Sequence, residues 1–266
     1  MTRALPRANT HNSRLLRFLN ENAMIEAVPT SEDVGQKLGD WLDFRQAIAL
    51  HAVLNPDTPI QATGPSRTPA LTPDGLRQHV TKVRASLEQS ILHGPPPGSE
   101  LTRIDMPPPE LNEPIEPKTA FEPYRRFQAA HQRQMESVVR TLRSQVRAQL
   151  AKSTTALQQL AALDATFESI LSEREAVLLG KVSRLLEKRF AQGLKQHLKK
   201  QADLATDSAP NEALPSAVQP LAWLMPIRQA MRTALLAELD TRLQPTLGLV
   251  EAFHAQKPQN NETLFL

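Results

Sequence analysis

The amino-acid sequence predicts an all-α fold. Ala, Leu, Gln, Arg and Glu dominate the composition, and these residues favour helices. Aromatic residues make up only 4% of the chain, and no run of β-branched or aromatic residues shows the two-residue alternation of a strand. Apolar residues instead recur at intervals of three and four over long stretches, which indicates amphipathic helices.

Clusters of proline divide the 266-residue chain into segments. Eight of the 22 prolines lie between Pro95 and Pro117, a stretch that cannot hold a helix and should be an extended, acidic linker. Weaker proline-rich breaks lie at 55–73 and 202–220. We therefore expect a small N-terminal helical region at 1–93, the linker at 94–118, a long-helix region at 119–255 and a tail at 256–266.

The N-terminal region contains three predicted helices. The first covers about residues 12–23. The second follows an N-cap at residue 30 or 31 and ends at Asn55, which precedes a proline. The third has Thr72 as its N-cap and Pro73 at its first helical position, and it ends at Gly94.

The C-terminal region is built from longer helices, predicted at 121–152, 155–201 and 221–255. We place a break near Thr155 because Thr155 and Gln158 form a capping-box pattern, and Pro245 should kink the last helix. The helix at 155–201 would be about 70 Å long, whereas a compact chain of this size has a radius of gyration of only about 18 Å. We therefore expect an elongated molecule, with these helices packed as an antiparallel bundle or coiled coil.

The residue types and their spacing do not suggest an enzyme. The chain has no cysteine, and its seven histidines never fall at metal-ligand spacing from each other or from carboxylates. No nucleophile, base and orienting group can be assembled from the sequence. We expect no catalytic residue, no metal, no cofactor and no small-molecule substrate. No segment approaches the roughly 20 apolar residues that a membrane span requires, and we expect a cytoplasmic protein.

Positive charge is concentrated in two helical segments, although the net charge is only +3. Residues 121–152 carry seven cations against two glutamates, and residues 181–200 carry seven against one. Within the first segment, arginines recur every seven residues, which would form a stripe beside the apolar seam. The favoured interpretation is a solvated face whose arginine stems cover the core edge. The alternatives are a track for phosphates, an acidic partner, a partner helix or an acidic lipid surface. The candidate residues are Arg126, Arg133, Arg140, Arg143 and Arg147.

The C-terminal tail and the two tryptophans are further candidates for partner binding. The chain ends on Leu264, Phe265 and Leu266, which either fold back as an apolar cap or form a short linear motif that a partner binds. Trp41 and Trp223 are each flanked by leucines. We expect them to anchor the core, with a partner-binding groove as the alternative for either one.

Several blocks of the sequence resemble an uncharacterised proteobacterial family that is defined only as a domain of unknown function. Members look like cytoplasmic products encoded beside envelope proteins similar to flagellar stators and OmpA-type wall binders. The resemblance implies an accessory role for an ion-driven envelope complex, and it supplies no catalytic residue. The blocks are Arg14–Leu19 (RLLRFL), Lys37–Asn55 (KLGDWLDFRQAIALHAVLN), Glu122–Arg147, Leu160–Phe190 and Leu243–Phe253.

These observations lead to a functional hypothesis with one alternative. The leading hypothesis is a non-enzymatic helical adaptor whose long C-terminal bundle binds another helical protein or a second copy of the chain. The alternative is a nucleic-acid-binding protein that uses the basic helical faces at 125–152 and 181–200. This alternative is less favoured, because few aromatic residues lie near the arginines to stack on bases.

Overall fold

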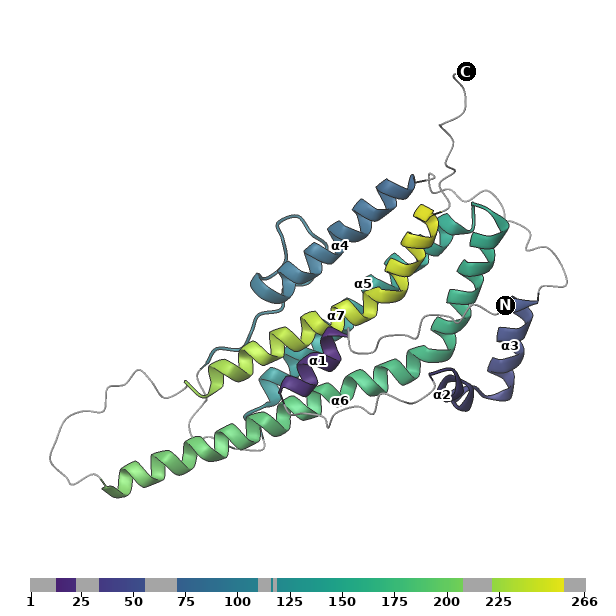
Figure 1. The fold of residues 1–266 in the computed structure, drawn as a ribbon. Coiled ribbons are helices and arrows are strands. Elements are labelled where there is room, and N and C mark those ends of the chain that lie inside the picture. Colours follow the sequence, from purple (N-terminus) through teal and green to yellow (C-terminus); the bar gives the residue numbers. More distant parts are fainter. Residues whose placement is uncertain are drawn as a thin grey trace, which may run out of the picture. The chain divides into compact units, whose positions relative to one another are not determined.

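The computed structural model describes residues 13–22, 34–55, 71–109, 116, 119–207 and 222–255. Within these ranges the chain forms seven helices and no strand, which confirms the predicted all-α class (Figure 1). The predicted tail, with Leu264, Phe265 and Leu266, lies outside the described residues. The helices are α1 (Arg14–Glu21), α2 (Val34–Trp41), α3 (Phe44–Leu54), α4 (Pro73–His93), α5 (Glu122–Leu150), α6 (Thr155–Asp207) and α7 (Leu224–Ala255).

The ends of α4 confirm the sequence prediction. The Thr72 hydroxyl accepts a hydrogen bond from the backbone N–H of Gly75 at 3.1 Å, so Thr72 caps the helix and Pro73 opens it. After the last residue of α4, Gly94 has a φ of +96°, a conformation that residues with a Cβ rarely adopt. Thr72 and Gly94 therefore mark the two ends of this helix.

The prediction of a single helix ending at Asn55 is wrong, because this segment is divided into α2 and α3 at Leu42 and Asp43. Asp43 caps α3, with its carboxylate accepting from the Gln46 backbone N–H at 2.8 Å. The Gln46 side chain in turn accepts from the Asp43 backbone N–H at 3.0 Å. This capping box satisfies two backbone donors and starts a new helix inside an uninterrupted apolar pattern.

The long helices follow the predicted order with shifted ends. The predicted break after α5 is confirmed, since α5 ends at Leu150 and α6 begins at Thr155. Helix α6 runs on to Asp207, six residues beyond the predicted end at Gln201. Helix α7 contains Pro245 without ending there.

The described residues fall into two compact units. The first lies within 1–26, 88–135 and 177–239, and the second within 27–87, 136–176 and 240–266. Each unit draws residues from both sides of the proline-rich segment, so their limits differ from the predicted region boundaries at 94–118.

The core of the first unit is centred on the N-terminal part of α7. This part of α7 buries residues on most of its circumference, which is the behaviour of a helix enclosed by its neighbours. Even its glutamate, Glu238, is buried, and it accepts a hydrogen bond from Gln132 of α5 at 2.8 Å. The buried apolar residues of this segment are Leu224, Ile227, Ala230, Met231, Ala234, Leu235, Ala237 and Leu239.

The second unit is an antiparallel arrangement of parts of α4, α5, α6 and α7. The Arg84–Asp240 ion pair at 2.6 Å and the contact between His254 and Asp74 at 3.2 Å show that α4 and α7 run in opposite directions. Helix α4 also contacts α5 through His79 and Gln145 at 3.2 Å. Helix α4 buries Leu76, Val80 and Leu87, and these polar contacts place it beside α5 and α7, although the sequence assigned it to the N-terminal region.

None of the helices in the described ranges combines the length and the apolar composition that crossing a membrane requires.

Candidate functional site

Two of the candidate arginines belong to a network of ion pairs in the second unit. Arg143 of α5 contacts Asp164 of α6 through two hydrogen bonds, at 2.8 and 2.6 Å. Arg147 contacts the same carboxylate at 3.1 Å and Glu168 at 2.6 Å. All four side chains are at least four-fifths shielded from solvent. The network joins α5 to α6. Because its charges are already paired and largely buried, Arg143 and Arg147 are not part of a solvent-exposed cationic stripe.

Burial and ion pairing shift the pKa of Arg143 in opposite directions. Desolvation alone would lower the pKa of its guanidinium, because an apolar environment disfavours the charged form. The hydrogen bonds and charge of Asp164, together with the charges of Glu168 and Glu175, outweigh desolvation, so that the pKa of Arg143 is raised. The guanidinium therefore stays charged, and its charge is committed to Asp164.

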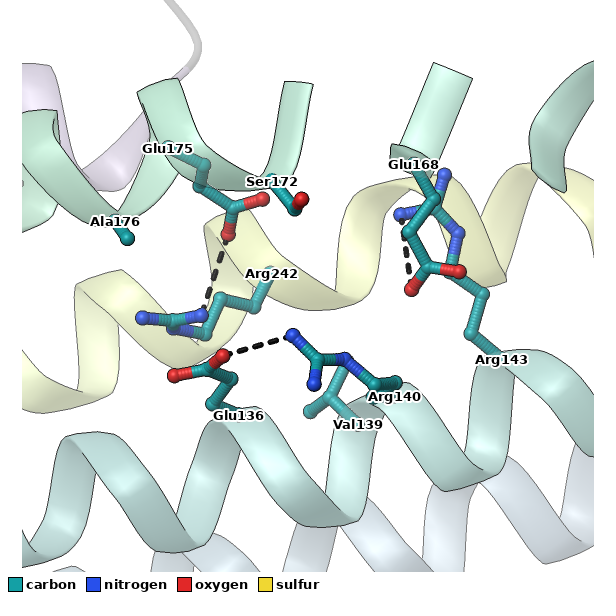
Figure 2. Close-up of a pocket in the computed structure, with 9 residues that line it drawn as sticks. All are labelled: Glu136, Val139, Arg140, Arg143, Glu168, Ser172, Glu175, Ala176 and Arg242. Carbon is teal, nitrogen blue, oxygen red and sulfur yellow. Dashed lines mark hydrogen bonds and ion pairs between the residues drawn. The ribbon is translucent and has the colours of Figure 1, made fainter. Parts of the chain in front are cut away.

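A recess beside this network is lined by charges that balance (Figure 2). Arg140 contacts Glu136 at 2.8 Å, and Arg242 of α7 contacts Glu175 of α6 at 3.4 Å. The lining thus holds three arginines and three glutamates, and it offers an anion no surplus of positive charge. Its residues are Glu136, Val139, Arg140, Arg143, Glu168, Ser172, Glu175, Ala176 and Arg242.

The arginines at seven-residue spacing do not share one environment. The Arg126 side chain is 79% exposed, whereas that of Arg147 is only 16% exposed. A straight α-helix turns about 20° short of two full turns over seven residues, so the series drifts by about 60° from the first arginine to the fourth. Arg126 and Arg140 each pair with a glutamate four residues earlier, while exposed Arg133 forms no ion pair with the residues that the structure describes.

Helix α3 exposes large apolar side chains. Phe44 is 80% exposed and Ile48 is 53% exposed. The two residues are four positions apart, which places them on the same face of the helix. None of the residues of α3 is buried. Trp41 and Leu54, at the ends of α2 and α3, are exposed as well. The predicted core role of Trp41 therefore does not hold, because its ring is partly open to solvent.

Polar contacts join α2 and α3 to α6. Arg174 of α6 donates to the backbone carbonyl of Trp41 at 2.7 Å, and its guanidinium lies 5.4 Å from the centre of the Trp41 ring. At the far end of α3, Gln159 donates to the carbonyl of Leu54 at 3.3 Å. These contacts position the two helices and leave the side chains of Phe44 and Ile48 exposed.

The second tryptophan packs with other aromatic rings in the first unit. The Trp223 ring lies 5.4 Å from that of Phe190 and 5.7 Å from that of His197, both on α6. Its close neighbour is Gly193, where an added Cβ would lie 2.8 Å from the indole ring. This placement agrees with the expected anchoring role of Trp223.

The basic segment at 181–200 of α6 contains one cation that is engaged within the structure. Arg189 donates to the Asn22 side chain next to α1. The other six cations of this segment are exposed, and they form no ion pair with described residues: Lys181, Arg184, Lys188, Lys195, Lys199 and Lys200.

In the described part of the chain, no group of three His, Asp or Glu side chains converges. His131 of α5 is buried, and desolvation lowers its pKa to about 4. The imidazole is therefore neutral at physiological pH, and its environment is that of a core residue beside the ring of Phe127.

Some residues that matter in these surfaces were not singled out by the sequence patterns. Asp164 and Glu168 are the ion-pair partners of Arg143 and Arg147. A single sequence does not reveal that α5 packs against α6 or in which register, so these partners could not be predicted. Phe44 and Ile48 show the four-residue spacing of a helix face, which fits a core face and an exposed face equally well. The Asp43–Gln46 capping pattern was the available signal that a separate helix begins there.

Comparison with known proteins identifies a family and nothing closer. Neither the curated proteins nor the solved structures contain a match to the chain. A family model described as "Protein of unknown function (DUF3348)" matches residues 1–255, which is nearly the full sequence. This chain therefore belongs to the DUF3348 family.

Proposed function

We propose that this protein is a non-enzymatic helical adaptor that inserts α3 into an apolar groove of another protein. The observation that supports the proposal is the exposure of Phe44 and Ile48 on a helix with no buried residue. Exposed apolar clusters on soluble proteins mark interaction sites. An apolar pair at a spacing of four residues is the pattern by which a helix anchors in a hydrophobic groove.

The contacts of α3 fit this role. Arg174 contacts Trp41 just before α3 and Gln159 contacts Leu54 at its end, so α3 is presented in a defined position before any partner arrives. Such preorganisation reduces the entropy lost on binding. The sequence pattern favoured a binding surface on the long C-terminal bundle, whereas the exposed side chains of Phe44 and Ile48 favour one on α3. The family resemblance suggests that the partner belongs to an ion-driven envelope complex.

The test compares complexes formed in the native cell by three forms of the tagged full-length chain. The forms are wild type, the double variant Phe44→Ser with Ile48→Ser, and a control with Val177→Ser and Met225→Ser. The control removes two apolar side chains that are also exposed, at 60% and 56%. Each sample is treated with nuclease, and bound proteins are quantified by mass spectrometry.

We expect the α3 variant to lose one specific partner at least about tenfold, because burying a large apolar side chain contributes about 1.5–3 kcal/mol. The control should keep this partner. Light scattering on the purified wild type identifies the case in which the partner is a second copy. If the α3 variant and the control retain the same partners and the same mass, the proposal is wrong.

A further inference from the structure

The exposed cations of α6 form one narrow stripe. From Lys181, the next members follow at 3, 7, 14 and 18 residues. At about 100° per residue, these offsets bring all five side chains into an arc of about 60°. The stripe extends about 27 Å along the helix, at about 1.5 Å per residue. It consists of Lys181, Arg184, Lys188, Lys195 and Lys199, and we call it the α6 stripe.

The α6 stripe faces away from the core of its own unit. The buried residues of the same segment, Val182, Leu186, Phe190 and Leu194, centre on the opposite side of the helix. The stripe is therefore free to meet a partner from outside.

The stripe carries charge of one sign only. The one acidic residue between 181 and 200 is Glu187, which pairs with Arg125 of α5 at 2.5 Å. No stripe member forms an ion pair with a described residue. Two exposed arginines of α5, Arg126 and Arg140, differ from the stripe, since neighbouring glutamates neutralise them. Surfaces that serve only solubility usually mix both signs, so this segregation points to a polyanion.

The outer face of α6 favours a hydrated polyanion over a membrane. Along the stripe itself, between residues 180 and 203 of the described ranges, no large apolar side chain is exposed, and the nearest ones on α6 are Val177 and Leu178, about one turn before Lys181. A helix that binds a bilayer surface inserts such side chains between the lipids. Gln192 and Gln196, both exposed beside the stripe, offer amide donors of the kind that bind phosphate oxygens. No exposed aromatic ring accompanies them, so single-stranded bases have nothing on which to stack.

We propose that the α6 stripe binds the phosphate backbone of duplex nucleic acid without reading its sequence. Its five cations supply the sequence-independent part of such binding, through release of the counterions that surround the duplex. This inference does not depend on the proposed adaptor function, because α3 and the stripe belong to different units and are tested with different variants.

The first measurement is the salt dependence of binding by the full-length chain. Fluorescence anisotropy with a labelled, random-sequence DNA duplex gives Kd at each salt concentration. Five phosphate contacts predict a slope of log K against log salt of about −4.5, which is a loss of about 500-fold between about 50 and 200 mM. Absence of binding at about 50 mM salt overturns the proposal.

Two charge-reversal variants locate the surface. Lys188→Glu with Lys195→Glu changes the centre of the stripe, and we expect Kd to rise about 100-fold at about 50 mM salt. Arg126→Glu with Arg133→Glu makes the same change in net charge on α5 and should leave Kd within a few-fold. Equal losses in both variants, or a loss confined to the α5 variant, overturn the proposal.

A third arm distinguishes other polyanions. Sedimentation with vesicles of phosphatidylcholine and phosphatidylserine, and titration with polyglutamate, use the same stripe variant and the same α5 control. We expect duplex DNA to bind more tightly than either competitor at equal salt. Tighter, stripe-dependent binding to the vesicles or to the acidic polypeptide would assign the stripe to that partner and overturn the nucleic-acid proposal.

Discussion

Arg143 of α5 and Asp164 of α6 meet at two points: Nε lies 2.8 Å from one carboxylate oxygen, and a terminal nitrogen lies 2.6 Å from the other. Each of the two side chains is only 11% exposed. A charge pair at this depth stabilises the fold only while both members are present, because a single buried charge has neither water nor a partner.

Removing one member of this pair should therefore destabilise the protein strongly. We expect Asp164→Ala to lower the free energy of unfolding by about 3 kcal/mol, near the low end for a broken buried pair because Glu168 remains 4.0 Å from Arg143. Urea denaturation followed by circular dichroism measures the change. Glu136→Ala, which removes the partner of exposed Arg140, should change stability by less than about 1 kcal/mol.

The pair should also be strongly coupled. We expect the double variant Arg143→Met with Asp164→Leu to regain most of the stability lost in Asp164→Ala, because apolar residues of similar volume need no ionic partner. A double-mutant cycle measures the coupling. Losses that simply add in the double variant would show that the two residues act independently.

Buried His131 makes stability depend on pH. Its pKa is about 4 in the folded chain, below its usual value of 6.5, so the unfolded chain binds a proton first as the pH falls. Stability from the neutral imidazole is complete above about pH 6.5 and declines toward pH 4. Between about pH 7 and 5 we expect a loss of about 2 kcal/mol from this group.

Denaturation at the two pH values, compared between variants, isolates this effect. His131→Leu should remove the loss, whereas His51→Leu, at an exposed position on α3, should keep it. An unchanged loss in His131→Leu would mean that other groups cause the acid sensitivity.

Two glycines on α6 should respond in opposite ways to alanine. At exposed Gly180 an added Cβ meets no atom within 4 Å, so Gly180→Ala should stabilise the protein by about 0.5–1 kcal/mol through helix propensity. At Gly193 the Cβ would lie 2.8 Å from the Trp223 ring, which Phe190 and His197 hold in place. We expect Gly193→Ala to destabilise by about 1–2 kcal/mol, since overpacking outweighs propensity.

Thermal unfolding of the two glycine variants gives the comparison directly. Combining Gly193→Ala with Trp223→Leu should make the alanine less harmful, because the ring that it meets is gone. A stabilising effect of Gly193→Ala alone would show that Trp223 moves aside easily.

The cap of α3 should control that helix without affecting the rest of the fold. Asp43→Ala removes the capping box and should destabilise the first turn of α3 by about 1 kcal/mol. Hydrogen exchange should quicken at Phe44 to Ala47, whereas the melting temperature should stay unchanged because α3 buries none of its residues. Asp43→Ser retains a capping oxygen and serves as the control. A lower melting temperature in Asp43→Ala would contradict the isolation of α3.

Much of the helical architecture could be predicted from local signals. Thr72, Pro73 and Gly94 specify the ends of α4 through capping and positive φ, which are properties of single positions. The division between α2 and α3 was missed because the apolar periodicity continues across Asp43, while the competing capping box is a short polar pattern. The periodicity of apolar residues alone does not reveal where a helix is interrupted.

The candidate site was less predictable, because it depends on which helices meet. Arg126 and Arg147 have the same side chain and related positions in a seven-residue pattern, yet one is exposed and the other pairs with Asp164. That difference arises from helix drift and from the register of α5 against α6. Equally, the exposure of Phe44 depends on what α3 packs against, and no single-sequence pattern contains that information.

The absence of buried residues on α3 has an evolutionary consequence. Selection for a stable fold acts on side chains whose loss opens the core. It therefore constrains Phe44 and Ile48 only weakly, because neither is buried. Mutation toward polar residues at these positions would improve solubility and leave folding intact. If related chains nevertheless retain large apolar residues there, the pressure that keeps them must come from outside the molecule, and the pattern of retention would trace the species in which the partner is present.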